Sequence, residues 1–188
     1  GYYWYFGSNA AVVPTTWLTH TGAATATQSV DPAAVSDGTY YLRVKTVDNA
    51  GNESVPATLF TFKYDTAAPV NPNVITETHG AQSGVAQATV GDPSFTWSGA
   101  ADATSGVAYY GVYFGSYSTG TSTITTTAAA YDPSATASGT YYLRLRTCDT
   151  AGNCSAWQTA FTFVYQPDSD GDGIPDSVEC PSGAPCPD

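Results

Sequence analysis

The residue pattern with the clearest chemical meaning lies near the C-terminal end of the sequence. From Asp168 to Glu179 the residues fit D-x-D-x-D-G-x5-E, the spacing of a calcium-binding loop. Calcium prefers oxygen ligands, and Gly173 permits the sharp turn that aims alternating carboxylates at one ion. Without a cation these carboxylates would repel one another. We therefore predict a calcium site whose ligands are Asp168, Asp170, Asp172, the carbonyl of Ile174, Asp176 and Glu179.

Other interpretations of the acidic residues stay open. The segment could be a solvated acidic linker, although a random cluster seldom keeps both the spacing and the glycine. Magnesium is a second candidate, but this many carboxylates suit the larger, more flexible shell of calcium better than a strict octahedron. A second calcium at the junction between modules, using Asp65 or Asp48, is a further hypothesis.

The four cysteines form two pairs of identical spacing, Cys148 with Cys154 and Cys180 with Cys186. Close pairs in even number are typical of disulfides in an oxidising compartment. Zinc is the alternative, but no histidine lies nearby and no C-x2-C spacing occurs. We expect two disulfides and an extracellular or cell-surface location.

Composition and charge argue against several classes of function. Lys and Arg total 5 against 16 Asp and Glu, a net charge of −11, so we expect neither nucleic acid nor an anionic membrane as partner. No apolar run reaches the ~20 residues that a membrane helix needs, so we expect no membrane insertion in this segment. His20 and His79 stand without the partner residues of a catalytic site, so the sequence predicts no enzyme.

An internal duplication organises the chain. Residues 36–65 recur as 137–166, with 17 of 30 positions identical at an offset of 101, whereas Tyr5-Phe6-Gly7 recurs as Tyr113-Phe114-Gly115 at an offset of 108. The difference, 108 − 101 = 7, means that the first copy carries seven extra residues between these blocks. An offset near 100 residues is the length of one β-sandwich module, so the chain is expected to hold two copies of one module.

Side-chain alternation predicts that the repeated blocks are strands. Residues 40–46 and 141–147 alternate between two faces with the period of a β-strand. The segment 48–52 is rich in Asp, Asn and Gly and predicts a hairpin, with Asp48 and Asp149 in Asx turns.

The two copies differ in what precedes them. Strands at 74–78 and 94–97 are predicted ahead of the second copy, and the first has no counterparts. Because the chain also contains no methionine, we expect a piece of a longer protein whose first module lacks its opening strands. Alternatively, strands from a neighbouring chain complete the module.

The motif Tyr40-x-Leu42-x-Val44-x-Thr46, followed by D-x-A-G-N, resembles the late strands of fibronectin type III and bacterial immunoglobulin-like repeats. The resemblance implies a β-sandwich and places Tyr40 and Tyr141 at a tyrosine corner, where the hydroxyl bonds to backbone upstream. The acidic tail, with prolines before and inside it, is similar to a thrombospondin type 3 repeat, although Glu179 stands where that family usually has Asp.

The expected fold class is all-β: tandem immunoglobulin-like β-sandwiches, the first one truncated, followed by an irregular calcium-binding acidic tail. The expected boundaries are a partial module over 1–65, a linker over 66–72, a complete module over 73–166 and a thrombospondin type 3-like calcium repeat over 167–188.

These features indicate a non-catalytic stalk, spacer or filament segment of a secreted or cell-surface repeat protein, rigidified by calcium. Its expected partners are other copies or neighbouring repeat modules, or cell-surface glycans or proteins. One alternative is a filament subunit completed by strands from a neighbouring chain. The other is a carbohydrate-binding or adhesin module that uses outward-facing aromatic residues, namely Tyr3, Tyr5, Tyr41, Tyr113 and Tyr142.

Overall fold

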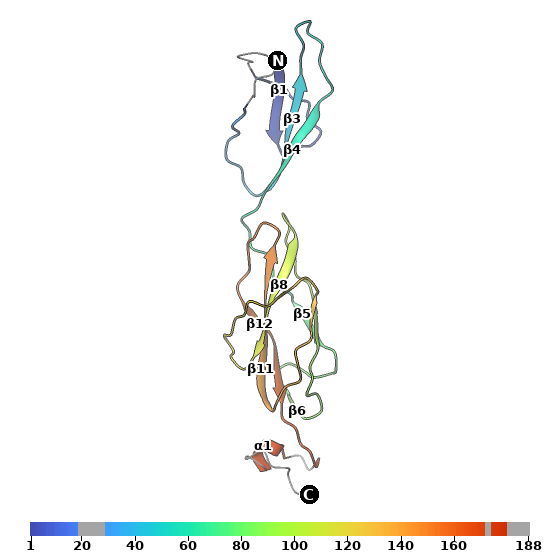
Figure 1. Ribbon diagram of the computed structural model, residues 1–188, viewed down its shortest axis with the longest axis vertical. Coiled ribbons are helices and arrows are strands. Elements are labelled where there is room, and N and C mark those ends of the chain that lie inside the picture. Colours follow the sequence, from blue (N-terminus) through green and yellow to red (C-terminus); the bar gives the residue numbers. More distant parts are fainter. Residues whose placement is uncertain (19–28, 172–173, 180–188) are drawn as a thin grey trace. The chain divides into compact units, whose positions relative to one another are not determined.

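The computed structural model describes residues 1–18, 29–171 and 174–179 (Figure 1). It divides into two compact units, Gly1–Ala67 (unit 1) and Ala68–Asp188 (unit 2). The described elements are antiparallel or parallel strands apart from one helical turn, α1 (Asp176–Glu179), which confirms the expected all-β class. None of the described helices is long and apolar enough to cross a membrane.

Unit 1 consists of one antiparallel sheet with the strand order β2-β1-β3-β4. Its strands are β1 (Tyr2–Gly7), β2 (Thr16–Leu18), β3 (Gly38–Thr46) and β4 (Ala57–Tyr64). Strands β3 and β4 form the hairpin that the sequence predicts, with a register shift between Leu42 and Arg43. Among the described residues of unit 1, no second sheet covers this one.

Unit 2 is a sandwich of two sheets. The larger sheet has the order β6-β12-β11-β8-β9 and the smaller one β10-β7-β5. Strands β5 and β7 match the two segments predicted ahead of the second copy. The strands are β5 (Val74–Glu77), β6 (Ala86–Gln87), β7 (Phe95–Ser98), β8 (Val107–Gly115), β9 (Thr125–Thr126), β10 (Ala130–Tyr131), β11 (Gly139–Asp149) and β12 (Gln158–Tyr165).

The core of unit 2 is formed by apolar side chains from both sheets. Phe95 and Trp97 come from β7, and they meet Val112 of β8 and the alternating apolar residues of β11 and β12. These side chains are at most 5 % exposed, so their burial supplies the main driving force for closing the sandwich.

The duplication is visible strand by strand. Strands β1, β3 and β4 correspond to β8, β11 and β12, and the register shift of β3 recurs between Leu143 and Arg144. Trp17 lies opposite Tyr3 just as Thr125 lies opposite Gly111, so the offset of 108 extends through β2. Since Asp31-Pro32 already follows the offset of 101, the seven extra residues fall between Leu18 and Asp31.

Both copies keep the tyrosine corner that the resemblance implies. The hydroxyl of Tyr40 donates to the carbonyl of Ser36 at 2.9 Å, and that of Tyr141 donates to the carbonyl of Ala137 at 3.1 Å. Each bond ties a strand to the backbone four residues upstream, which fixes where the strand begins.

Both predicted Asx turns are also present. In unit 1, Asp48 Oδ1 accepts the backbone N–H groups of Ala50 and Asn52, at 2.9 and 2.8 Å. In unit 2, Asp149 Oδ1 accepts the N–H of Asn153 at 2.8 Å. Each turn also contains a glycine with positive φ, Gly51 at 88° and Gly152 at 99°, a conformation that other residues adopt only with strain.

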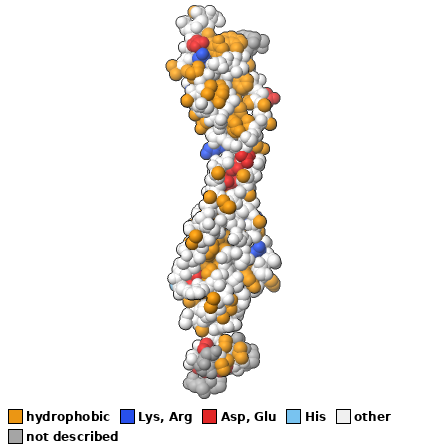
Figure 2. Space-filling view, turned by 180° about the vertical axis from the view of Figure 1, so that it is seen from behind, with side chains coloured by type: hydrophobic (Ala, Val, Ile, Leu, Met, Phe, Trp, Pro, Cys, Tyr) orange, Lys and Arg blue, Asp and Glu red, His pale blue; other side chains and the backbone are white. Residues whose placement is uncertain are grey.

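The units differ most in the exposure of one sheet face, the face that packs inward in the sandwich of unit 2. Phe60 of β4 is 57 % exposed, whereas its counterpart Phe161 of β12 is 5 % exposed. Hydrophobic side chains are correspondingly abundant on the surface of unit 1 in the view of Figure 2. The absence of a covering sheet among the described residues explains this difference, because the residue types are the same in both copies.

Candidate functional site

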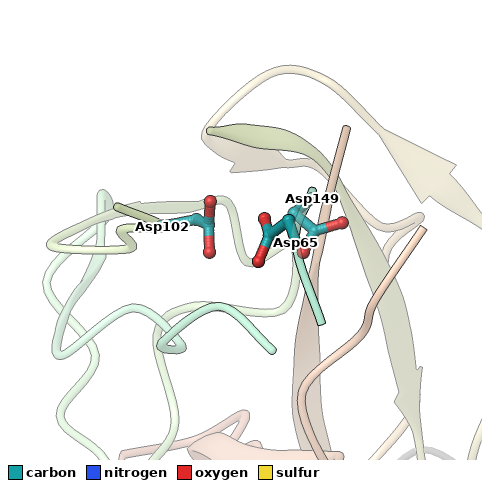
Figure 3. A group of neighbouring side chains, drawn as sticks. All are labelled: Asp65, Asp102 and Asp149. Atoms are coloured by element: carbon teal, nitrogen blue, oxygen red, sulfur yellow. The ribbon is translucent and has the colours of Figure 1, made fainter. Parts of the chain in front are cut away.

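Two aspartates of unit 2 form a pair that could hold a metal ion. Asp102 and Asp149 each offer one carboxylate oxygen, and these oxygens lie within 4.8 Å of each other (Figure 3). Asp149 is buried and Asp102 is half-buried. A donor set made only of carboxylate oxygens suits hard cations such as calcium or magnesium.

Backbone hydrogen bonds hold Asp102 in place. It lies in the loop between β7 and β8, where its Oδ1 accepts the N–H groups of Thr104, Ser105 and Gly106 at 3.1, 2.8 and 2.8 Å. These bonds, that from Gly106 foremost, stabilise the charged form and lower the pKa of Asp102. The side chain is therefore a carboxylate at neutral pH, the form that binds a cation.

Asp149 is positioned by the hairpin that joins β11 to β12. Its Oδ2 accepts the side-chain N–H of Asn153 at 2.9 Å, in addition to the backbone bond at Oδ1. The side chain is only 2 % exposed. In unit 1 the same turn lowers the pKa of Asp48, chiefly through the side-chain hydrogen bond from Asn52.

The sequence hypothesis of a second calcium site at the junction between modules, using Asp65 or Asp48, stays a prediction. The pair in unit 2 includes Asp149, the repeat counterpart of Asp48. Asp102 was missed altogether. The available signal was the stretch Asp102-Ala103-Thr104-Ser105-Gly106, whose composition is typical of an Asx turn that orients a carboxylate.

The predicted calcium loop in the tail is described in part. Asp168 Oδ1 accepts the N–H of Gly171 at 2.9 Å, while Asp176 accepts the backbone N–H and the hydroxyl of Ser169, both at 2.7 Å. These bonds bring the two ends of the loop together. Asp172 lies outside the described residues, so the six-residue ligand set remains a prediction.

The tail is less irregular than expected at one point. α1 forms a single helical turn whose last residue is the predicted ligand Glu179. The backbone N–H groups of Val178 and Glu179 both bond to the carbonyl of Pro175. Proline favours the first turn of a helix because its φ is already helical and its missing N–H is not needed there.

One of the two expected disulfides is present, between Cys148 and Cys154 across the β11–β12 hairpin. The equivalent positions in unit 1, Val47 and Glu53, pair as an isolated β-bridge without a covalent link. Cys180 and Cys186 lie outside the described residues.

The outer face of unit 1 carries an aromatic cluster beside a lysine. Tyr3 of β1 and Trp17 of β2 pack edge to face, with ring centroids 4.9 Å apart. Lys45 Nζ lies 4.5 Å from the centroid of Tyr3 and 2.7 Å from Glu53 Oε2. Trp17 is 47 % exposed, so a large part of its surface is open to solvent.

Unit 2 builds a similar pair with a ring from the segment directly ahead of β12. Gly111 stands where unit 1 has Tyr3, and an added Cβ there would meet Arg146 and Trp157 at 2.9 and 3.2 Å. The guanidinium of Arg146, the counterpart of Lys45, lies 5.2 Å from the Trp157 ring. Sequence reasoning did not select Trp157, because its counterpart in the first copy is a proline.

Two of the tyrosines that were expected to face outward make hydrogen bonds within the fold. The hydroxyl of Tyr5 accepts the N–H of Asn9 at 3.3 Å, and that of Tyr113 accepts the N–H of Tyr117 at 3.1 Å. In each case the ring lies along its own strand, against the glycine two residues further on. Their repeated geometry points to a structural role.

The described histidine takes part in a turn. His79 Nδ1 lies 2.8 Å from the carbonyl oxygen of Asp92, and the carboxylate of buried Glu77 accepts backbone N–H groups of His79, Ala81 and Ser94. These bonds hold the turn after β5 against the start of β7. His20 lies outside the described residues.

Comparison with known proteins gives one informative similarity. The chain is 34 % identical over 168 residues to Exoglucanase B of Cellulomonas fimi. The similarity covers 85 % of this chain and 14 % of that protein, so the chain spans about one seventh of the length of its relative. No family model matches the sequence.

Proposed function

We propose that this chain is a non-catalytic, carbohydrate-binding segment of a secreted protein that acts on polysaccharides. The observation that carries the proposal is the similarity over most of the chain to a small part of an exoglucanase. The β-sandwich of unit 2 and its disulfide fit an extracellular protein. Fold alone does not define function, so the binding surface has to be argued from side chains.

The outer face of unit 1 is the surface that we propose for binding. Sugar rings present C–H groups that pack on aromatic faces, and an exposed aromatic ring that is already held in place loses little entropy on binding. Trp17 meets both conditions, because it is 47 % exposed and packs against Tyr3. Lys45, which lies over the ring of Tyr3, adds a hydrogen-bond donor for sugar hydroxyls.

A polysaccharide panel tests this proposal. The purified chain would be mixed with insoluble cellulose, xylan and chitin, and the unbound fraction measured. We expect depletion by at least one polysaccharide and weaker depletion for Trp17→Ala. The matched control is Tyr117→Ala, which removes a 74 % exposed tyrosine from a loop of unit 2. Equal depletion by all three proteins, or none, would contradict the proposal.

A second candidate function is that of a spacer stiffened by calcium. Its specific support is the aspartate group of unit 2, Asp102 and Asp149, together with the calcium-loop spacing of the tail. Calcium would cancel repulsion between the carboxylates and stabilise the folded state by mass action. This role is compatible with carbohydrate binding, because the proposed calcium ligands and the aromatic cluster of Tyr3 and Trp17 have no residue in common.

Calcium titration calorimetry with two variants tests the spacer role. One double variant, Asp102→Asn with Asp149→Asn, removes charge from the aspartate group. The other, Asp168→Asn with Asp170→Asn, removes charge from the tail. We expect the first to lose only the calcium site of the aspartate group and the second to lose only the calcium site of the tail. If the unmodified chain takes up no calcium at millimolar concentration, the affinity range of many extracellular modules, the spacer role is wrong.

A further inference from the structure

We propose that the inner face of the unit 1 sheet is a docking surface for two antiparallel β-strands of the β5 and β7 type, and that these strands belong to polypeptide joined directly ahead of Gly1. The completed module would be a two-sheet sandwich like unit 2. This inference is independent of carbohydrate binding, which we assign to the opposite face of the sheet.

The first support is the difference in exposure between equivalent side chains of the two units. Leu143, Phe161 and Phe163 are 0–5 % exposed in unit 2. Their counterparts Leu42 and Phe62 are only half-buried, and Phe60 is 57 % exposed. A contiguous exposed apolar face of this kind marks an interaction site, because leaving it in water is unfavourable.

The second support is the shape of this face. It forms a hollow of about 490 Å³ whose floor includes Phe6, Leu42, Phe60 and Phe62, and whose wall includes residues 30 and 32–35. The wall segment corresponds to residues 131–136 of unit 2, which begin at the last residue of β10. In unit 2, β10 pairs with β7 through Ala130 and Tyr131. Unit 1 therefore has the floor and one wall of a strand site.

The third support is the chemistry of the side chains that fill this position in unit 2. Phe95 of β7 packs on Phe114 and Phe161, with ring centroids 5.6 and 5.3 Å away. Trp97 packs edge to face on Tyr110 at 5.3 Å. The three receiving rings recur in unit 1 as Phe6, Phe60 and Tyr2. The expected occupant thus carries two aromatic residues at alternate positions of one strand.

The connectivity of unit 2 favours strands joined to unit 1 over strands from a separate molecule. There β7 leads into β8 through residues 99–106 alone, and β1 is the counterpart of β8. A strand pair joined to β1 by an equally short loop pays only a small closure entropy, whereas a separate molecule also loses translational and rotational freedom.

An extended chain tests the proposal. A copy of residues 68–108 placed directly ahead of Gly1 restores the spacing of the repeat, because Gly1 corresponds to Tyr109. We expect lower fluorescence of an apolar dye, and amide exchange in residues 57–64 slowed about tenfold or more relative to the original chain. The matched control carries Phe95→Ser and Trp97→Ser in the copied segment only, and should behave like the original chain.

Three results would overturn the proposal. One is unchanged exchange and dye binding in the extended chain. Another is equal protection by the control extension, which would mean that the aromatic residues do not fill the hollow. The third is a concentration-dependent dimer of the original chain with residues 57–64 already protected, measured by sedimentation and exchange, which would make a second copy the occupant.

Discussion

Phe60 and Phe161 hold the same position in the two copies of the repeat, yet Phe60 is 57 % exposed and Phe161 is 5 % exposed. Both lie on the inner face of a strand that pairs with the strand of the tyrosine corner, opposite Leu42 and Leu143. The difference comes from the surroundings. Phe161 packs against Phe95 of the second sheet, and the described part of unit 1 has no such sheet.

The equivalent substitutions Phe60→Ala and Phe161→Ala should therefore differ in their effect on stability. Phe161→Ala leaves a cavity in a closed core, and we expect unit 2 to lose about 3–5 kcal/mol of unfolding free energy. Phe60→Ala removes a side chain that is half in water, so unit 1 should lose less than about 2 kcal/mol. Hydrogen exchange of the two β-hairpins, read peptide by peptide, measures both losses in one chain. Equal losses would contradict this account of the two cores.

Removal of the hairpin disulfide should weaken unit 2 alone. Replacing Cys148 and Cys154 by Val and Glu gives unit 2 the pair that unit 1 carries at these positions. The closed loop is short, with a sequence separation of 6, so the expected loss is only about 2 kcal/mol. Urea unfolding of unit 2 would be followed by the fluorescence of Trp97 and Trp157, with Trp4 and Trp17 replaced by Phe. A reducing agent should have the same effect on the parent chain and none on the double variant.

The turn at Asp102 predicts a pH dependence of unit 2. The lowered pKa of Asp102 means that ionisation is favoured in the folded state. The ionised side chain therefore contributes fully to the unfolding free energy of unit 2 above the ordinary Asp pKa of about 3.9. This contribution is lost as pH falls through the lower pKa of the folded state. Asp102→Asn should therefore destabilise unit 2 at pH 7 and make its stability less dependent on pH below 4.

Asp48→Asn provides the matched control for this pH dependence. The pKa of Asp48 is lowered by the equivalent turn of unit 1, so the substitution should leave the acid limb of unit 2 unchanged. The stability of unit 2 would be measured from pH 2 to pH 7 through the fluorescence of Trp97 and Trp157, again with Trp4 and Trp17 replaced by Phe. An identical pH profile for the parent chain and Asp102→Asn would show that the turn does not couple folding to ionisation.

The local parts of the fold were predictable from the sequence. The hairpins, the Asx turns of Asp48 and Asp149 and the tyrosine corners of Tyr40 and Tyr141 depend on residues at most a few positions apart. Such patterns are fixed by backbone geometry and hydrogen bonding within one segment. Because the chain holds two copies of the repeat, each of these patterns occurs twice in the sequence.

The candidate site was predictable only in part, because its residues meet through tertiary structure. Asp102 and Asp149 are 47 positions apart in the sequence, and only the closed sandwich brings the β7–β8 loop beside the end of β11. The ring beside Arg146 comes from Trp157 rather than from the position of Tyr3. Alternation along one strand gives the face of a residue, but it does not say which neighbouring strand supplies its contact.

The most direct test of the proposed function is a binding isotherm on insoluble cellulose for the parent chain, Trp17→Ala and the control Tyr117→Ala. The loss of one stacking ring is worth about 1.4 kcal/mol, so we predict that Trp17→Ala raises the dissociation constant about tenfold. The control should match the parent chain. Binding that is unaffected by Trp17→Ala would contradict the assignment of the surface, and no binding to cellulose or the other polysaccharides would contradict the function itself.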